Sequence, residues 1–344
     1  MALLLIEGFE GFGTSAGSAP SPTDVVGRRY SVSAENYMRI ASGRTGGYAL
    51  DFNRYTCYLE SEPLTTDDTL IWGAAFKRET TDQVAIVAFY DGSQRGMNLQ
   101  VAASASEISV YRDATLIDTS TGAGIGTNSW DYIEFKVLCD NTAGTYEVRV
   151  NGVNVCSGTG TDTQAGSNAY HDRVRLAPSD TSGVHPTWDD MYVCDSTGSV
   201  NNDFLGNHKV VRINPDGDDT TGFGTSTPSA NHYENVDETI CDDDTSYVEE
   251  STNTNKDIWT YGSVASLGTI AGLVVRTMAK ETDATDFELI TIVESNGTEY
   301  DDSGQAMSSS YTEFTRLEEQ DPDTNSAWTM AAINAANFGV KVKT

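Results

Sequence analysis

The stretch that decides the fold is residues 144–158, which read GTYEVRVNGVNVCSG. Apolar and polar side chains alternate on both sides of Asn151-Gly152, which is the pattern of two β-strands that each bury one face. Asn-Gly is the pair best suited to the positive φ angles of a tight type I′ turn. The stretch therefore predicts an antiparallel β-hairpin.

Similar strand patterns lie on both sides of this hairpin. They are separated by clusters of glycine, asparagine, aspartate and serine, and they cover residues 69–79, 83–92, 97–104, 107–119, 130–140 and 171–178. Asp91-Gly92 and Asp113-Ala114 mark two further turns. Because helical periodicity is nearly absent, the first half of the chain is predicted to be an antiparallel β-sandwich.

The length of 344 residues is about twice the usual size of a domain, so two domains are expected. The polar stretch STGSVNNDFLGN after Asp195 is the natural boundary. We expect a first domain over 1–197, a linker over 198–206 and a second domain over 207–344. The second domain is predicted to be a smaller β-sandwich that opens with a strand at 207–215 and contains one short helix at 325–338.

The net charge of −30 limits the partners of the chain. The densest groups of bases, Arg28-Arg29 and Arg173 with Arg175, are short pairs in a chain of 51 acidic and 21 basic residues. Binding to nucleic acid or to a polyanionic membrane surface is therefore not expected. The opening MALLLIEGFE lacks a basic flank, and no later apolar run is long enough for a membrane span, so we expect neither signal peptide nor membrane segment.

The cysteines and histidines form no recognisable chemical site. The five cysteines lie at wide, irregular spacings and are expected as free thiols, with a Cys139–Cys156 disulfide as the less favoured alternative. No histidine has a serine or cysteine nucleophile in a familiar setting; the four are His171, His185, His208 and His232. We therefore expect no nucleophilic catalysis and no cofactor.

Four segments of the first half carry a resemblance to a known fold family. GGYALDF (46–52), WDYIEFKV (130–137), YEVRVNGVNV (146–155) and WDDMYVCD (188–195) resemble the laminin G-like, concanavalin A-like jelly rolls, over about residues 1–197. The resemblance implies a concanavalin A-like jelly-roll sandwich for this part of the chain. With the second, smaller sandwich predicted from the strand patterns after it, the whole chain is expected to be all-β.

A second resemblance spans nearly the whole chain. The order of EGFEGFGT (7–14), the jelly roll, DDDTSYVEES (242–251) and WTMAAINAANFGVKV (328–342) resembles a group of tailed-bacteriophage virion proteins. This resemblance implies a structural component exposed on the surface of a capsid or tail, with no known chemistry.

Paired carboxylates are the remaining signature of an enzyme. Glycoside hydrolases of the jelly-roll type carry them at alternate positions of one strand, where both reach the same face. Asp131 and Glu134 are three residues apart and are expected on opposite faces. Asp189 and Asp190 are adjacent, so they also face opposite sides unless a bulge intervenes. We predict a protein that is not an enzyme.

Ligand sites are weakly marked in the sequence. The acidic stretches 214–220 and 241–245 supply oxygens for calcium but lack the spacing of an EF-hand loop, so solvated turns are the favoured interpretation. The Asn296 sequon is expected to be a hairpin turn. Aromatic side chains available to hold a glycan are Tyr48, Tyr90, Tyr111, Tyr170 and Trp188, although packing in the sandwich is their commoner role.

Together these observations predict a non-enzymatic bacteriophage virion protein, either a capsid decoration or an accessory part of a tail or fibre. It is expected to assemble in the host cytoplasm and to act by docking on other virion proteins of the capsid or tail, as a homo-oligomer. The alternative is an adhesin that binds host surface polysaccharide through the jelly roll. The sequence assigns no catalytic, metal or ligand-binding residue, and it leaves open which domain docks on the particle.

Overall fold

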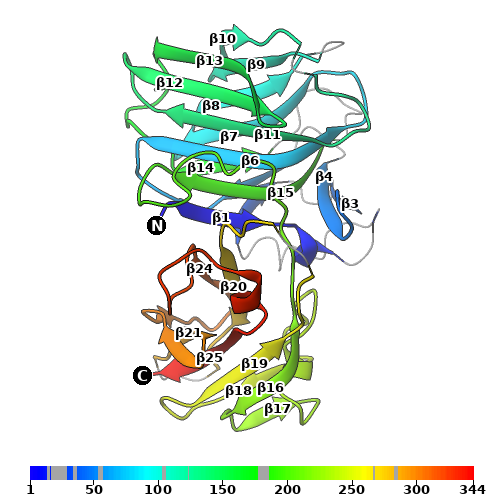
Figure 1. Ribbon diagram of the computed structural model, residues 1–344, viewed down its shortest axis with the longest axis vertical. Helices are drawn as coiled ribbons and strands as arrows, with labels where there is room; N and C mark the ends of the chain where they lie inside the picture. The colour runs from blue at the N-terminus through cyan, green and yellow to red at the C-terminus, as the bar shows by residue number, and fades with distance from the viewer. Residues whose placement is uncertain are drawn as a thin grey trace. The chain divides into compact units, whose positions relative to one another are not determined.

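The computed structural model describes residues 1–13, 16, 29–33, 37–52, 57–102, 106–122, 124–176, 186–265, 268–282 and 286–344. They form two compact units, Met1–Val210 and Val211–Thr344, and the named strands of both units pair antiparallel (Figure 1). The protein is therefore all-β, as its sequence predicts. Among the described residues, no helix has the length and apolar character needed to cross a bilayer.

The first unit contains two large sheets. In spatial order, the eight-stranded sheet consists of β13 (Val153–Thr161), β12 (Gly144–Val150), β11 (Asp131–Leu138), β6 (Thr69–Arg78), β15 (Pro186–Asp195), β4 (Tyr48–Phe52) and β3 (Met38–Ser42), with β1 (Leu3–Glu7) paired to β15. The seven-stranded sheet consists of β10 (Thr115–Thr119), β9 (Ile108–Arg112), β8 (Gln94–Val101), β7 (Val84–Asp91), β14 (Arg173–Leu176), β5 (Tyr58–Ser61) and β2 (Tyr30–Ser33). A one-turn 3-10 helix, Glu10–Phe12, follows β1.

Apolar side chains from the two sheets form one continuous core, which confirms the predicted sandwich. Phe135 of β11 stacks on Phe89 of β7 with ring centroids 4.9 Å apart. Trp188 of β15 is fully buried, and its indole nitrogen donates a hydrogen bond to Ile86 O at 2.9 Å. Burial of large side chains of this kind supplies most of the free energy that favours folding.

The predicted hairpin turns are confirmed. Asn151 and Gly152 have φ angles of 50° and 80°, as a type I′ turn requires. Asp113, between β9 and β10, has a φ angle of 50°, and Asn296-Gly297 forms the same kind of turn in the second unit. These turns depend on local backbone preferences, which explains why sequence reading located them.

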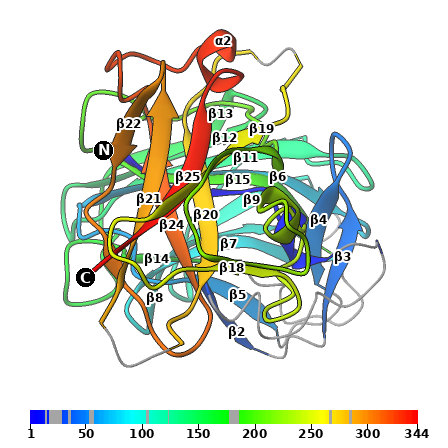
Figure 2. The same cartoon turned by 90° about the horizontal axis from the view of Figure 1, so that it is seen from below.

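The second unit is built on a six-stranded sheet, whose strands β21 and β25 lie side by side in Figure 2. This sheet consists of β16 (Pro215–Thr221), β19 (Lys256–Tyr261), β25 (Asn337–Lys343), β21 (Glu288–Ser295) and β22 (Thr298–Asp301), with β23 (Gln305–Ala306) paired to β21. Two pairs of strands accompany it: β17 (Thr225–Thr227) with β18 (Tyr247–Glu249), and β20 (Leu273–Ala279) with β24 (Thr312–Glu318). Phe314 of β24 packs against Trp259 and Leu289 of the large sheet. A one-turn 3-10 helix spans Tyr233–Asn235.

Two predicted elements of the second unit are wrong. The expected helix at 325–338 is a single turn, α2 (Met330–Ile333), which Thr329 begins by accepting a hydrogen bond from Ala332 N. Asn337 and the residues after it are instead in β25, because they pair with β19 and β21. The expected strand at 207–215 is also absent, since residues 207–214 form no strand and β16 begins at Pro215.

Candidate functional site

The adjacent carboxylates Asp189 and Asp190 lie at a β-bulge in the middle of β15. The register of β15 against β6 shifts between Asp189 and Tyr192, and Asp190 has a φ angle of 53°. β15 pairs with β4 before this point and with β1 after it. The expectation that the two carboxylates face opposite sides is therefore wrong, because a bulge, the exception named for that expectation, is present.

Arg44 brings the two carboxylates together. Its backbone N–H donates to Asp189 Oδ2 at 2.7 Å, and its guanidinium Nε donates to Asp190 Oδ2 at 2.8 Å. Its two terminal nitrogens donate to Asn207 Oδ1 and His208 O. The guanidinium also lies over the ring of Tyr132, 5.3 Å from the centroid.

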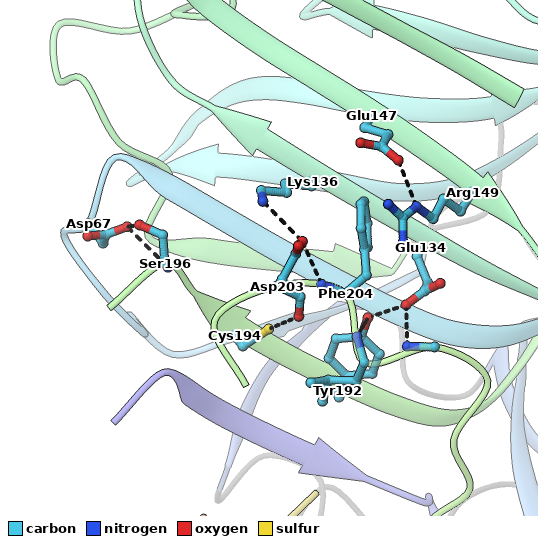
Figure 3. A network of polar contacts seen from close by, with 12 residues as sticks. Asp67, Glu134, Lys136, Glu147, Arg149, Tyr192, Cys194, Ser196, Asp203 and Phe204 are labelled. Atoms are coloured by element: carbon cyan, nitrogen blue, oxygen red, sulfur yellow. Dashed lines mark hydrogen bonds and ion pairs between the residues drawn. The ribbon is translucent and has the colours of Figure 1, made fainter. Parts of the chain in front are cut away.

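The segment of residues 203–210, which we call the connector, runs over the outer face of the eight-stranded sheet (Figure 3). Glu134 accepts hydrogen bonds from the Tyr192 hydroxyl at 2.5 Å and from Gly206 N at 2.8 Å. Phe204 lies under the Arg149 guanidinium, 4.1 Å from carbon to ring centroid. Residues 198–206 were expected to be a linker, and they lie within the first unit, which extends to Val210.

A glycine makes room for this arrangement. A Cβ atom on Gly73 of β6 would come within 2.3 Å of the Tyr192 ring, so no larger residue fits without moving the ring. Tyr192 in turn accepts a hydrogen bond from Leu205 N at 3.0 Å through its hydroxyl. The ring and its hydroxyl therefore hold the connector against the sheet.

Burial changes the acidity of the bulge. Burial, together with the charge of the neighbouring Asp190, raises the pKa of Asp189 to about 7; burial also raises the pKa of Asp190. Both carboxylates are bound by groups of the protein itself, namely Arg44, Val210 N and Asp190 N. We therefore interpret the bulge as a structural clamp on the connector.

The outer face of the seven-stranded sheet carries a different set of polar and aromatic groups. Leu59, Leu99, Val110, Val174 and Leu176 of its strands lie in the core, so the alternate side chains point outward. We call the following outward side chains the arginine-tyrosine face: Tyr58, Glu60, Tyr90, Asn98, Tyr111, Arg173 and Arg175. The strand register places five residues in one row across β5, β14, β7, β8 and β9: Glu60, Arg175, Ala88, Asn98 and Tyr111.

Arg175 is the centre of this face. Its guanidinium carbon lies 4.1 Å from the centroid of the Tyr58 ring and 4.0 Å from that of the Tyr90 ring. Its Nε and Nη2 atoms reach Glu60 Oε2 at 2.7 and 2.6 Å, while Nη1 has no hydrogen-bond partner among the described residues. Burial raises the pKa of Tyr90, whose hydroxyl therefore stays protonated and able to donate.

Arg173 and Asn98 contrast on the same face. Arg173 Nε lies 3.8 Å from Asp172 Oδ1, beyond hydrogen-bond distance, and it is buried without a hydrogen-bond partner in the described part of the chain. Asp172 accepts a hydrogen bond from Gly92 N at 2.9 Å instead. The Asn98 amide is fully engaged, because it donates to Tyr111 O and Asp113 O and accepts from Gln100.

The aromatic residues considered for glycan binding separate into two groups. Tyr90 and Tyr111 lie on the arginine-tyrosine face, whereas Trp188 is in the core and Tyr48 packs against it. Tyr170 is half-buried in the loop before β14. Sequence reading missed Tyr58, and it considered Arg173 and Arg175 only as a basic pair, although their alternation with core residues in RVRL marks an outward face.

The acidic stretches and the histidines are placed as follows. Residues 215–220 lie in strand β16, so the turn expected at 214–220 is wrong, while Asp244 of 241–245 pairs with Lys280. No group of three or more His, Cys, Asp or Glu side chains within the described ranges could hold a metal ion. His171 is buried, which lowers its pKa to about 4, and His185 lies outside the described residues.

The cysteines and the remaining carboxylates also have defined environments. The five cysteines are free, which excludes the Cys139–Cys156 disulfide. Asp131 accepts hydrogen bonds from Gly126 N and Asn151, while Glu134 contacts the connector, so the two carboxylates serve separate contacts.

Comparisons with known proteins give partial similarities of fold. No family model matches the chain, and no curated protein matches it. An endo-β-1,4-glucuronan lyase from the fungus Trichoderma reesei is 12% identical with a TM-score of 0.38, and the match covers 48% of this chain and 90% of that one. An alginate lyase is 9% identical with a TM-score of 0.43, and the match covers 55% of this chain and 95% of that one. Domain 4 of an extracellular arabinanase from Geobacillus stearothermophilus, solved with arabinotriose, is 15% identical with a TM-score of 0.39, and the match covers 56% of this chain and 92% of that one.

Proposed function

We propose that the protein is a non-enzymatic adhesin whose first unit binds polysaccharide on the arginine-tyrosine face. The observation that carries this proposal is the row that runs from Glu60 through Arg175 and Asn98 to Tyr111. Glu60 and Asn98 are buried at its base, and the partly exposed groups in it are the Tyr111 ring and the Arg175 guanidinium, which packs on the rings of Tyr58 and Tyr90. Aromatic rings stack on the apolar faces of sugars, and fixed polar groups beside them bind hydroxyls.

Ala88 adds to the suitability of this face. Its small side chain lies between Arg175 and Asn98 in the row, so the middle strand projects less than its neighbours. A polymer laid along the row would contact the guanidinium on one side of Ala88 and the Tyr111 ring on the other. This arrangement favours an extended chain of sugars over a single one.

The proposed setting of this adhesin is the surface of a bacteriophage virion, as an accessory component of capsid or tail. The resemblance of the sequence to tailed-phage virion proteins supports this setting. A reconstruction of particles that contain the chain tests it: hundreds of copies indicate lattice decoration, three or six indicate a tail element, and absence from the particle contradicts it.

The binding proposal is tested by pull-down of the full chain on a panel of immobilised polysaccharides, with soluble polymer as competitor. We expect competable binding that falls about tenfold or more in Tyr111→Ala, which removes a stacking ring, and in Tyr58→Ala, which removes the ring that supports the Arg175 guanidinium. Tyr247→Ala, a change of a half-buried tyrosine in the second unit, is the control and should bind as the unchanged protein does. Equal binding by all variants would show that the polysaccharide binds elsewhere on the protein.

The proposal that the protein is not an enzyme is tested with the same polymers. Glu60, the carboxylate in the row, is already paired with Arg175, whereas glycoside hydrolysis needs a carboxylic acid and a second carboxylate across the bond. We expect no new chain ends and no unsaturated product after prolonged incubation. Product that disappears when Glu60, Tyr90 or Arg175 is replaced would make the protein an enzyme.

A further inference from the structure

The hydrogen-bonding groups of the arginine-tyrosine face are unbalanced. Among the described residues, no hydrogen-bond partner is found for the N–H groups of Arg173, whose Nε forms only a long ion pair with Asp172 at 3.8 Å, or for Nη1 of Arg175. The acceptors nearby are mostly engaged: Glu60 Oε2 binds Arg175, and the Asn98 carbonyl binds Gln100. Guanidinium N–H groups are strong donors and never acceptors. The face therefore favours a ligand that is rich in acceptor atoms.

The opposite face of the same unit shows what such a donor set does when acceptors are present. Arg44 lies over a tyrosine ring and pairs with a carboxylate, as Arg175 does. Its remaining terminal nitrogens donate to the Asn207 side-chain oxygen and the His208 carbonyl of the connector. In the eight-stranded sheet the chain itself supplies the acceptors, whereas on the seven-stranded sheet Nη1 of Arg175 and the N–H groups of Arg173 have no hydrogen-bond acceptor among the described residues.

The local charges of this face, in contrast to the net charge of −30 that disfavours nucleic acid, identify the acceptor. The chain has 21 basic residues against 51 acidic ones, yet two of the four residues of β14 are arginines that point outward beside Tyr90. Planar guanidinium groups match carboxylates in both geometry and charge, and such bonds are stronger than those to neutral hydroxyls. A neutral sugar hydroxyl also accepts hydrogen bonds from these donors, but more weakly, because it carries no charge.

We propose that the arginine-tyrosine face selects polysaccharides that carry carboxylate groups, as polymers of uronic acids do, with Arg173 and Nη1 of Arg175 as the groups that bind the carboxylate. This inference rests on the proposed carbohydrate-binding function and adds the class of polymer. Arg173 is the more decisive of the two, because no protein carboxylate hydrogen-bonds it in the described part of the chain.

The test uses the full chain with polygalacturonate, alginate and hyaluronan, each alongside the same polymer after chemical reduction of its carboxylates to alcohols. Affinity electrophoresis should show binding to at least one acidic polymer, at least about tenfold weaker binding to its reduced form, and weakening by added salt. Arg173→Gln should lower affinity for the acidic polymer about tenfold and leave affinity for the reduced form unchanged.

Arg112→Gln is the matched control. Arg112 belongs to the same sheet, but its register partner Met97 is in the core, and it pairs with Asp162 at the edge of the sandwich. This variant should bind like the unchanged protein. Circular dichroism of both variants should match that of the unchanged protein, which verifies that the fold is retained.

Each other outcome has a definite meaning. Equal affinity for acidic and reduced polymers would overturn the carboxylate inference and leave the carbohydrate-binding function standing. Binding to dextran sulfate, but to none of the carboxylated polymers, would replace carboxylate with sulfate and also overturn the inference. Binding to none of the polymers, acidic or reduced, would overturn the proposed function as well. An equal loss in Arg112→Gln and Arg173→Gln would show a general effect of charge and contradict a site on this face.

Discussion

The two outer faces of the first unit use the same types of side chain in different ways. On the eight-stranded sheet, Arg44 lies over Tyr132, pairs with Asp190 and binds the connector. On the seven-stranded sheet, Arg175 lies against Tyr90 and pairs with Glu60, but one end of its guanidinium has no partner among the described residues. An arginine, a tyrosine and a carboxylate therefore do not by themselves mark a binding site; what marks it is whether the chain satisfies the remaining donors.

The difference between the two faces is tested most directly by removing Arg44. Arg44→Ala leaves the buried Asp190 without its counter-charge, and we expect it to lower the free energy of unfolding of the first unit by about 3–5 kcal/mol. Urea denaturation measures this loss. Arg95→Ala is the control, since the Arg95–Asp113 pair is exposed and should contribute less than about 1 kcal/mol. Equal losses in the two variants would show that the clamp is not structural.

The pH dependence of stability sharpens the same contrast. Because the pKa of Asp189 is about 7 in the folded protein and near 4 in the unfolded chain, its contribution is fully present below about pH 4 and is lost as the pH rises through about 7. From about pH 5 to pH 8 the unchanged protein should lose about 2–3 kcal/mol more than Asp189→Asn does. Urea midpoints at the two pH values measure the difference, and parallel profiles would contradict the raised pKa.

The two tyrosines offer a smaller test. Tyr192→Phe removes the hydroxyl that donates to the buried Glu134 and accepts from Leu205 N, so we expect a loss of about 1–2 kcal/mol. Tyr90→Phe removes a hydroxyl without a hydrogen-bond partner among the described residues and should change stability by less than about 0.5 kcal/mol. Thermal unfolding followed by circular dichroism compares them. A larger effect at Tyr90 would assign a structural role to the arginine-tyrosine face.

The smallest expected effect on stability is that of Arg173→Gln, within about 0.5 kcal/mol, because this change breaks no hydrogen bond. The same variant is expected to lose affinity for acidic polymers, so stability and binding should separate at this position. Urea denaturation of the variant used in the binding test provides the measurement. A loss of more than about 2 kcal/mol would mean that the guanidinium is a structural group.

Local sequence signals predicted the sandwich well. Asn151-Gly152 and Asn296-Gly297 specify their turns through their own backbone preferences, and the alternation in β12 specifies which face is buried. The helix predicted for the alanine-rich stretch 325–338 was wrong for the opposite reason. Its helix propensity is outweighed at Asn337 and Phe338 by pairing with β19 and β21, which are distant in sequence.

The candidate site was only partly predictable. Tyr90 and Tyr111 were identifiable as available aromatic residues, but their position beside Arg175 depends on a register set by five strands. The bulge at Asp190 was considered only as an exception to the expected alternation of Asp189 and Asp190 across the strand. Its left-handed backbone lies where β1 replaces β4 as the partner of β15, and these strands lie more than a hundred residues before it in the chain.

We expect the connector to affect how the protein responds to mechanical force. A pull on the second unit is transmitted to the first through Val210, whose N–H donates to Asp190, and through the connector residues that Arg44 and Glu134 hold. These contacts must rupture in turn before tension reaches the end of β15 at Asp195. We therefore expect the connector to take up load before the C-terminal end of β15 does, whereas β1, which begins at Leu3, is loaded directly when the N-terminal end is pulled.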